Sequence, residues 1–285
     1  MCKNELKVNQ GTKGDHYFKQ AILKVMMDGM KDENPRPVWH DGTPAHSYFV
    51  TQFVESYDLS KGEVPITTVK PTAFKTAIRE MFWIYQKQSN SLQDAHDMGI
   101  MWWDEWESKD YPGTIGHRYG YVVNKYKLID NLIEGIKTNP YGRRHNMNLN
   151  QYTDLASSDG LHSCAFETLW SVRGEYLDCT LIQRSNDVCA AMDVNNVQYS
   201  CLLMMIAKAT GYKPGVFTRF VQNLHIYDRH MEVAKEYLSR KPEVTEEPVR
   251  IVFEPKSDNF YEFTIDDFRL ENYNPQPRLK VELAI

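Results

Sequence analysis

Residues 164–187 read CAFETLWSVRGEYLDCTLIQRSND, and this stretch decides the fold class. Apolar and polar side chains alternate along residues 166–172 and again along residues 177–183, which is the period-two pattern of β-strands. Residues 174–175 are Gly and Glu, so the two strands are expected to pair as a hairpin. The polar residues 184–187 follow directly, which predicts a cluster of polar side chains where the second strand leaves its sheet.

Three other segments have the pattern of helices that pack on a core. Residues 197–212 carry a single charge and stop at Gly211, which is typical of a buried helix and its C-terminal cap. Residues 72–86 are largely apolar and begin with Thr72, whose hydroxyl suits an N-cap. Residues 16–30 place an apolar stripe on one helical face. Because these elements show no regular βαβ alternation, we predict an α+β fold.

The composition and the missing motifs exclude several classes of protein. Of the 285 residues, 42% are hydrophobic and 25% are charged, as in ordinary globular domains, and we expect residues 1–285 to form one domain. The formal charge is -5, so no global positive field attracts nucleic acid or an anionic membrane. No apolar run approaches the roughly 20 residues of a membrane span. Residues 1–5 lack the layout of a signal peptide, so we expect a cytoplasmic protein. Dinucleotide-binding, P-loop, zinc-protease and α/β-hydrolase motifs are missing.

The five cysteines are Cys2, Cys164, Cys179, Cys189 and Cys201. Their odd number and the lack of a CxxC pair predict reduced thiols, with neither a disulfide framework nor a metal site. Cys164 precedes a predicted strand, whereas Cys179 and Cys201 lie at positions typical of packing, so Cys164 is the best candidate nucleophile. A free cysteine is more often a small buried hydrophobe, so this interpretation needs a nearby cation. Arg184 can supply one if the two strands pair.

Other polar residues allow both a functional and a structural interpretation. Glu80 lies within a largely apolar helix, so it is either salt-bridged or a proton-handling group. Arg143 and Arg144 follow a turn and suit bidentate contact with phosphate, although a solvated basic pair is commoner. His225 and Tyr227 alternate along a predicted strand, so both would point from one face toward a common ligand. The residues alone leave these alternatives open.

Taken together, these segments resemble the thymidylate synthase family over nearly the whole chain. The most specific match runs from Cys164 through residues 183–187 to Asn195 and Tyr199, whose spacing is similar to the family's catalytic-Cys, Q-R-S-x-D and Asn pattern. Further matches follow in the family's order at residues 41–43, 80, 103–106, 116–120, 139–140, 143–144, 225–227, 266–268 and 273–275.

The resemblance implies an enzyme that methylates dUMP to dTMP and needs no metal. The co-substrate would be 5,10-methylenetetrahydrofolate, which serves as one-carbon donor and reductant and leaves as dihydrofolate. Cys164 would add to carbon 6 of the pyrimidine, which is covalent catalysis. Glu80, with Tyr119 and ordered water, would form the proton relay. Asn195 would read the edge of uracil, because a carboxamide both donates and accepts.

The resemblance also implies the binding residues and the assembly. The nucleotide would be held by Arg184, Ser185, Gln183, Asn195, His225 and Tyr227. The folate would contact Trp103, Asp187 and Leu161, and Ile285 would close over the site. The implied fold is a large mixed β-sheet packed against long buried helices, in a homodimer whose subunits meet sheet to sheet. Arg143 and Arg144 would reach the phosphate across the interface, and neither membrane nor DNA is an implied partner.

The chain departs from the family's pattern at several positions. His162 and Ser163 replace two prolines that commonly precede the nucleophile, Ala165 replaces a His, and Leu169 replaces a Gln. An Arg in the first phosphate loop corresponds to Gly42, so that contact is missing or comes from another residue such as Arg36. Residues 190–194 and the segment Val221, Gln222 and Asn223 also differ, which affects folate geometry and substrate choice.

Two alternatives have the same early chemistry or the same fold. Pyrimidine hydroxymethylases acting on dUMP or dCMP let water complete the reaction in place of hydride. The deoxycytidylate enzyme carries Asp at the position of Asn195, so Asn195 favours uracil. A catalytically idle nucleotide-binding homologue is the second alternative. The presence of Cys164, Glu80 and Asn195 argues against it.

Overall fold

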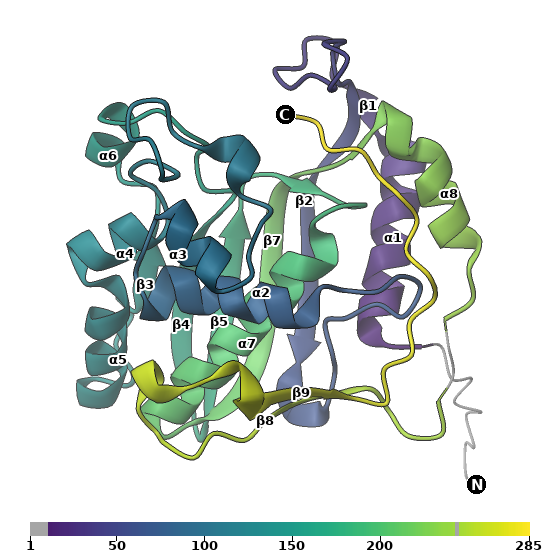
Figure 1. The fold of residues 1–285 in the computed structure, drawn as a ribbon. Helices are drawn as coiled ribbons and strands as arrows, with labels where there is room; N and C mark the ends of the chain where they lie inside the picture. The colour runs from purple at the N-terminus through teal and green to yellow at the C-terminus, as the bar shows by residue number, and fades with distance from the viewer. Residues whose placement is uncertain (1–10, 243–244) are drawn as a thin grey trace, which may run out of the picture.

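A computed structural model of the chain describes residues 11–242 and 245–285, and Cys2 and residues 1–5 lie outside these ranges. A mixed seven-stranded sheet organises the described residues, in the order β1-β2-β7-β5-β4-β3 with β6 paired to β7 (Figure 1). Its strands are β1 (Met30–Lys31), β2 (Ser47–Asp58), β3 (Asn146–Asn148), β4 (Ala165–Arg173), β5 (Tyr176–Gln183), β6 (Asn186–Asp187) and β7 (Lys213–Tyr227). The predicted α+β class with a large mixed sheet is confirmed.

Eight α-helices lie in the described ranges, and most of them pack on one face of the sheet (Figure 1). They are α1 (Lys13–Asp28), α2 (Phe74–Met81), α3 (Leu92–Asp97), α4 (Gly120–Tyr126), α5 (Leu128–Thr138), α6 (Tyr152–Ala156), α7 (Met192–Thr210) and α8 (Met231–Ser239). Near the C-terminus, β8 (Arg250–Phe253) and β9 (Phe268–Glu271) form a separate antiparallel pair. No helix in these ranges has the length and apolar character needed to cross a membrane.

The predicted hairpin is present as β4 and β5. The strands pair antiparallel up to Arg173 and Tyr176, and Gly174 takes a positive φ of 63° in the turn, a conformation that glycine adopts without strain. Strand β5 then pairs in parallel with β7, which pairs antiparallel with β2, and these two pairings make the sheet mixed. Strand β5 is therefore a central strand of the sheet, with β4 on one side and β7 on the other.

Helix α7 is the long core helix that the sequence predicted, but it begins five residues earlier than expected. It starts at Met192 and ends before Gly211, whose φ of 81° provides the left-handed cap. The first turn is polar, containing Asp193, Asn195 and Asn196, so a prediction based on apolar character missed it. This extra turn places Asn195 on a rigid helix.

Residues 72–86 are largely helical, as predicted, but the start of the helix and the form of its last turn differ from the prediction. Helix α2 begins at Phe74, and the residues 82–86 that follow form a single π-helical turn. Thr72 is not an N-cap, because its hydroxyl donates to Asp193 Oδ2 at 2.6 Å. A π-turn is often found at functional sites, and this one begins two residues after Glu80.

Helix α1 lies three residues N-terminal to its predicted range. Thr12 and Asp15 form a capping box at its start. The helix stops at Asp28, because Met30 already pairs with Phe49 as part of β1. The apolar stripe predicted for this segment is present, and its residues Phe18 and Ile22 are buried.

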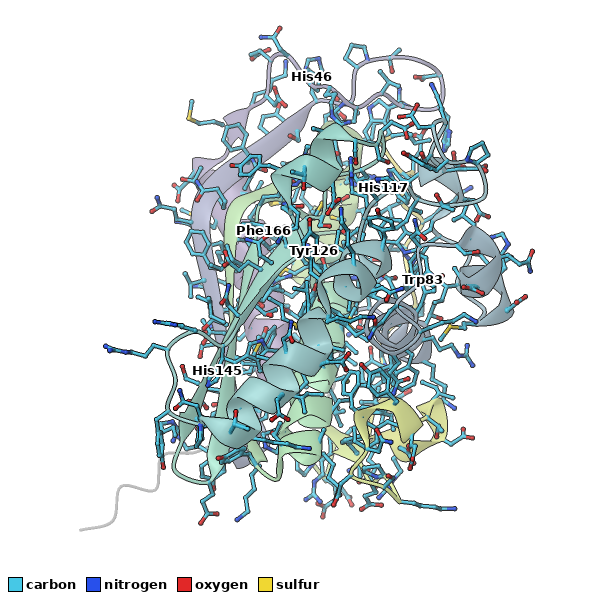
Figure 2. The ribbon with its side chains drawn as sticks, turned by 90° about the vertical axis from the view of Figure 1, so that its left-hand side faces the viewer. His46, Trp83, His117, Tyr126, His145 and Phe166 are labelled. Atoms are coloured by element: carbon cyan, nitrogen blue, oxygen red, sulfur yellow. The ribbon has the colours of Figure 1, made fainter. Side chains whose placement is uncertain are left out.

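The second face of the sheet lacks a covering layer in the described residues. Strand β5 alternates buried residues with partly exposed ones, and so does the middle of β7. Val54 on β2 and Leu169 on β4 are 51% and 41% exposed. Figure 2 shows the sheet from its edge, with helices gathered on one side. The sheet is therefore open on the side away from the helices.

Candidate active site

A pocket of about 280 Å³ lies where β5 ends, between the first turn of α7, the C-terminus of α2 and the last residues of the chain. It brings together Cys164, Glu80, Tyr119 and Asn195, together with most of the other predicted site residues, which are Gln183, Arg184, Ser185, Asp187, His225, Tyr227, Trp103, Leu161 and Ile285. A larger cavity of about 650 Å³ lies elsewhere, beside Lys61 and Lys208, and contains none of these residues. The chemistry-bearing residues therefore converge on the smaller pocket.

Cys164 lies half-buried immediately before β4 and is the cysteine that faces this pocket. The Nη2 atom of Arg184 lies 3.4 Å from its Sγ. Burial raises the pKa of the Cys164 thiol, and the positive charges of Arg184 and Arg36 oppose that rise. The cation that the nucleophile hypothesis required is therefore in place.

The guanidinium of Arg184 is held by backbone carbonyls next to the cysteine. It donates to Ser163 O at 3.2 Å and to His162 O at 2.6 Å, and its own backbone N–H donates to Cys164 O at 2.9 Å. Because these acceptors are main-chain atoms, the replacement of two prolines by His162 and Ser163 leaves the support of Arg184 intact.

Glu80 is buried, and its exposed fraction is as small as that of residues in the hydrophobic core. Burial raises its pKa to about 7, and the nearby donor groups of Trp102, Gln198 and Trp103 limit the rise. The indole Nε1 of Trp102 donates directly to Glu80 Oε2. A carboxyl group with this pKa can both take and return a proton near neutral pH.

Tyr119 lies between the nucleophile and Glu80. The Cys164 backbone N–H donates to its hydroxyl at 3.3 Å, and burial raises the pKa of the phenol. Its backbone is in an unusual region, with φ of 47° and ψ of -110°. Such strain in a residue other than glycine is typical of functional sites.

The Asn195 carboxamide is fixed by three amide partners. Its Oδ1 accepts from Gln183 Nε2 at 2.9 Å and from Asn186 Nδ2 at 3.0 Å. Its Nδ2 donates to Gln198 Oε1 at 2.8 Å. One Nδ2–H remains free among these contacts, and it suits a carbonyl oxygen of a bound base.

His225 and Tyr227 point from the same face of β7, as the alternation predicted. Their ring centroids are 5.0 Å apart and both side chains line the pocket. Burial lowers the pKa of His225, so the ring is neutral at neutral pH, and its Nδ1 lies 3.0 Å from Asn223 Oδ1. Burial raises the pKa of Tyr227 to about 12. Two neutral hydrogen-bonding groups suit a sugar hydroxyl.

The predicted folate residues all line the pocket. Trp103 packs edge-on against Tyr119, with ring centroids 5.1 Å apart. Asp187 Oδ1 accepts backbone N–H groups from Cys189 at 2.8 Å and Ala190 at 3.3 Å. Ile285 is held against Val38 by two backbone hydrogen bonds of 2.8 and 2.9 Å. The chain terminus therefore forms one wall of the pocket.

The loop before β2 contributes one arginine, Arg36, to the pocket. Arg36 lines the pocket, whereas Gly42 does not, and the Arg36 charge acts on Cys164 and Tyr227. Arg36 is therefore placed to supply a phosphate contact in place of the arginine that is missing at Gly42. Of the other departures, Ala165 lines the pocket and Leu169 lies on the open sheet face.

Arg143 and Arg144 do not reach the pocket of their own chain. They are exposed in the loop between α5 and β3 and line a separate hollow with Tyr141 and His145. The prediction that they contact phosphate therefore requires a second subunit.

Sequence reasoning missed three polar residues that support the site: Trp102, Gln198 and Asn186. Gln198 lies three residues after Asn195, and such neighbours share one face of a helix. That spacing predicts a contact between Asn195 and Gln198 only if both residues are helical, and the predicted helix began at residue 197. Trp102 gave no signal that distinguished it from Trp103.

One group of side chains has the ligand types of a metal site. Asp187, Cys189 and His230 place their ligand atoms within 4.8 Å of one another. Burial raises the pKa of the Cys189 thiol, and Asp187 Oδ1 already accepts two backbone N–H groups. A metal would need the deprotonated thiol, so these residues fit a metal poorly.

Comparisons with known proteins agree with this geometry. The thymidylate synthase family model matches residues 16–285. Proteins named thymidylate synthase from Streptococcus pneumoniae and Streptococcus sanguinis are each 46% identical over 280 residues, covering 96% of this chain and all of theirs. The solved structure of the thermostable thymidylate synthase A from Bacillus subtilis superposes with a TM-score of 0.88 at 36% identity, covering 95% of this chain and 99% of that one. The chain therefore belongs to the thymidylate synthase family.

Proposed function

We propose that this chain catalyses the reductive methylation of dUMP to dTMP, with 5,10-methylenetetrahydrofolate as co-substrate and dihydrofolate as the second product. The observation that carries the proposal is the arrangement of Cys164, Arg184, Asn195 and Glu80 around one pocket. A nucleophile, a cation, a base-reading amide and a proton-handling carboxyl are the groups that this reaction requires. The names of the relatives support the same activity.

Cys164 acts as the nucleophile of the reaction. Its Sγ adds to carbon 6 of the pyrimidine, a bond forms between sulfur and carbon, and the electrons of the carbon 5–carbon 6 double bond move toward the carbon 4 oxygen. The free N–H of Asn195 Nδ2 stabilises the negative charge on that oxygen. Arg184, 3.4 Å from Sγ, favours the thiolate that begins the step.

Glu80 handles the proton on carbon 5 after the one-carbon unit has attached. With a pKa of about 7, a large fraction of the carboxyl is ionised at neutral pH and accepts this proton. Tyr119 lies between Glu80 and Cys164 and positions the water that connects them to the base. Loss of this proton would allow the folate nitrogen to leave the one-carbon unit. Once hydride has been delivered to that unit, the carbon 5–carbon 6 double bond is restored and Cys164 leaves carbon 6 as the thiolate.

The folate supplies the one-carbon unit and the hydride when it is bound. Trp103 offers an aromatic surface for a flat heterocycle, Asp187 offers a carboxylate oxygen at the pocket wall, and Leu161 adds apolar contact. Ile285 lies over the pocket mouth, where it excludes water. Exclusion of water matters because water in place of hydride would yield a hydroxymethyl product.

The nucleotide phosphate binds at the cationic rim of the pocket. Arg184, Ser185 and Arg36 lie there in one chain. The exposed pair Arg143 and Arg144 completes the phosphate site from a partner subunit. Gln183 and Asn195 contact the base, while His225 and Tyr227 contact the sugar.

A homodimer in which two sheets face each other would bring those arginines into place. The open sheet face is half apolar: Phe220 pairs with both Val54 and Ile182, and Thr180 pairs with Leu169, so these side chains share that face. Burial of such a face against a second copy is favourable. Residues 1–285 would then act as one catalytic domain in each subunit, with DNA and membrane absent from the reaction.

The proposal is tested by incubating the protein with dUMP and 5,10-methylenetetrahydrofolate and identifying the nucleotide by mass spectrometry, with dCMP in parallel. We expect dTMP together with one equivalent of dihydrofolate. A 5-hydroxymethyl nucleotide with tetrahydrofolate would replace the proposal with a hydroxymethylase. Binding of dUMP without any product would identify an idle homologue.

A further inference from the structure

A continuous line of hydrogen-bonding side chains leads from a buried ion pair in the sheet to the base-reading amide. Arg219 on β7 is fully buried and forms an ion pair with Glu55, its cross-strand neighbour on β2. The Nη1 atom of Arg219 also donates to Gln183 Oε1 at 3.3 Å and to Met192 O at 3.2 Å. Gln183 Nε2 donates in turn to Asn195 Oδ1 at 2.9 Å.

The line continues past Asn195 to the carboxyl group that handles the proton. Asn195 Nδ2 donates to Gln198 Oε1 at 2.8 Å, and the Gln198 side chain hydrogen-bonds to Glu80. Gln183 and Gln198 are both almost fully buried, so water does not compete for these bonds. Each amide in the line therefore has one side that accepts and one side that donates.

The chemistry of Arg219 fixes the direction of the whole line. A guanidinium has five N–H donors and no acceptor, so the Gln183 atom that faces it must be the oxygen. The Gln183 amide nitrogen then faces Asn195, which must present its oxygen, and the Asn195 nitrogen faces Gln198. Turning over any one amide would place two donors or two acceptors against each other in a buried site, which is costly.

We propose that Arg219 is a positioning residue that sets the orientation of the Asn195 carboxamide and thereby the preference of the pocket for uracil over cytosine. This inference rests on the proposed function, because it assumes that Asn195 contacts the base. With Oδ1 engaged by Gln183 and Asn186, the group that Asn195 has free is an N–H. A free N–H matches the carbonyl oxygen on carbon 4 of uracil and opposes the amino group of cytosine.

Glu55 compensates the positive charge of Arg219 in the protein interior. It neutralises Arg219, and its Oε2 accepts from Tyr57 at 2.6 Å and from Asn196 at 2.8 Å. A buried ion pair contributes little net stability compared with apolar residues, so a role in specificity explains its presence at this position. The second buried pair, Lys70 with Asp193, lies outside the line of amides and provides a matched control.

The test is the ratio of dUMP to dCMP affinity, measured by equilibrium dialysis of the full-length protein without folate, so that turnover does not occur. The double substitution Glu55→Gln with Arg219→Met removes the obligate donor and leaves no unpaired charge. We expect the ratio to fall about tenfold or more. Arg219→Lys retains a donor and should keep the ratio within about twofold. Lys70→Met with Asp193→Asn should lower stability and leave the ratio unchanged.

A second variant reverses the direction and does not depend on removing the ion pair. In Gln183→Glu the carboxylate still accepts from Arg219 but cannot donate to Asn195. Asn195 then turns its nitrogen toward residue 183, and Asn186, whose Oδ1 has no partner among the described residues, can turn to accept from it. Gln198 turns as well, so that its amide nitrogen donates to Asn195 Oδ1. The free group of Asn195 becomes an acceptor, so the ratio of dUMP affinity to dCMP affinity should fall by about 100-fold.

The outcomes separate this inference from the proposed function. If the unaltered protein fails to bind dUMP, the proposed function is overturned. If it prefers dUMP and both the Glu55→Gln/Arg219→Met protein and the Gln183→Glu protein keep that preference while folded by circular dichroism, the role of Arg219 is overturned.

Discussion

The inner half of the pocket and its rim are built on different principles. The inner half consists of side chains that hydrogen-bond to one another, such as the half-buried Asn195 between the buried Gln183 and Gln198. The proposed phosphate-binding rim combines Arg184, which is hydrogen-bonded, with exposed arginines. Within the described part of the chain, neither Arg36 nor Arg143 forms a side-chain hydrogen bond or an ion pair. The inner half is therefore organised before any ligand binds, whereas in our proposal the rim is completed by an anion and by a second subunit.

The strongest test of the inner half is Cys164→Ser. We expect turnover to fall by roughly 10⁴-fold or more, because a hydroxyl is a much weaker nucleophile than a thiolate. Binding of dUMP should change by only a few fold, since the rim and the base-reading amide are unaltered. Steady-state assays together with equilibrium dialysis check both values, and near-normal turnover would remove Cys164 from its role.

The next largest effect is expected for Glu80→Gln, which should lower kcat by about 10²–10⁴-fold. The unaltered enzyme should lose activity as the pH falls below about 7, because protonated Glu80 cannot accept the carbon 5 proton. Measurement of kcat against pH, with release of tritium from 5-tritiated dUMP, checks this step. A Glu80→Gln protein that released tritium at the normal rate would contradict the assignment.

The same substitution should affect stability in the opposite sense to activity. The pKa of Glu80 is raised from 4.5 to about 7 in the folded protein, so the folded state retains this proton at pH values where the unfolded chain has lost it. The free energy of unfolding contributed by Glu80 therefore falls as the pH rises from about 4.5 to about 7. Urea unfolding at pH 8 should show Glu80→Gln more stable than the unaltered protein, by at most about 3 kcal/mol. Equal stability at pH 8 would show that burial of the carboxyl is not costly.

At the rim, Arg144→Ala should raise KM for dUMP about 10- to 100-fold with a smaller effect on kcat, because one charge-assisted contact with phosphate is lost. Mixing this variant with Cys164→Ser under conditions that exchange subunits should restore activity, since one pocket of a mixed dimer then has all its residues. Sedimentation equilibrium verifies the dimer. Failure to restore activity in proven mixed dimers would place the arginines outside the partner's pocket.

The smallest effect is expected for Trp102→Phe, which removes one donor to Glu80. The hydrogen bond lowers the pKa of Glu80, so its loss should move the acidic limb of the kcat profile to higher pH by about half a unit or more. The value of kcat at the optimum should fall about threefold to tenfold. Trp106→Phe, at a nearby aromatic residue, provides the control and should leave the limb in place.

The sequence predicted the inner half far better than the rim. The β4–β5 hairpin and the polar cluster after it followed from local alternation, and pairing of the two strands brought Arg184 to Cys164 as expected. The sequence could not predict that Arg36, and not Gly42, lines the pocket, because the three-dimensional course of a loop is not contained in a linear pattern. Arg143 and Arg144 lie outside the pocket of their own chain, and their proposed contact with phosphate depends on a second copy, which the sequence of one chain does not describe.

The polar support of the site could not be read from the sequence. Arg219 interrupts the apolar face of β7, and its partner Glu55 lies 164 positions away in the chain. Only the pairing of β2 with β7 brings the two side chains together. Contacts of this kind depend on the tertiary fold, whereas strands and helix caps depend on near neighbours.

The central claim is that the preorganised inner half delivers Cys164 to carbon 6 of a uracil nucleotide. The most direct measurement uses 5-fluoro-dUMP with 5,10-methylenetetrahydrofolate, because fluorine on carbon 5 cannot leave as the proton does and the covalent adduct accumulates. After proteolysis, mass spectrometry should locate the nucleotide and the folate on the peptide that contains Cys164. An unmodified Cys164 peptide, or an adduct on Cys179, Cys189 or Cys201, would contradict the account.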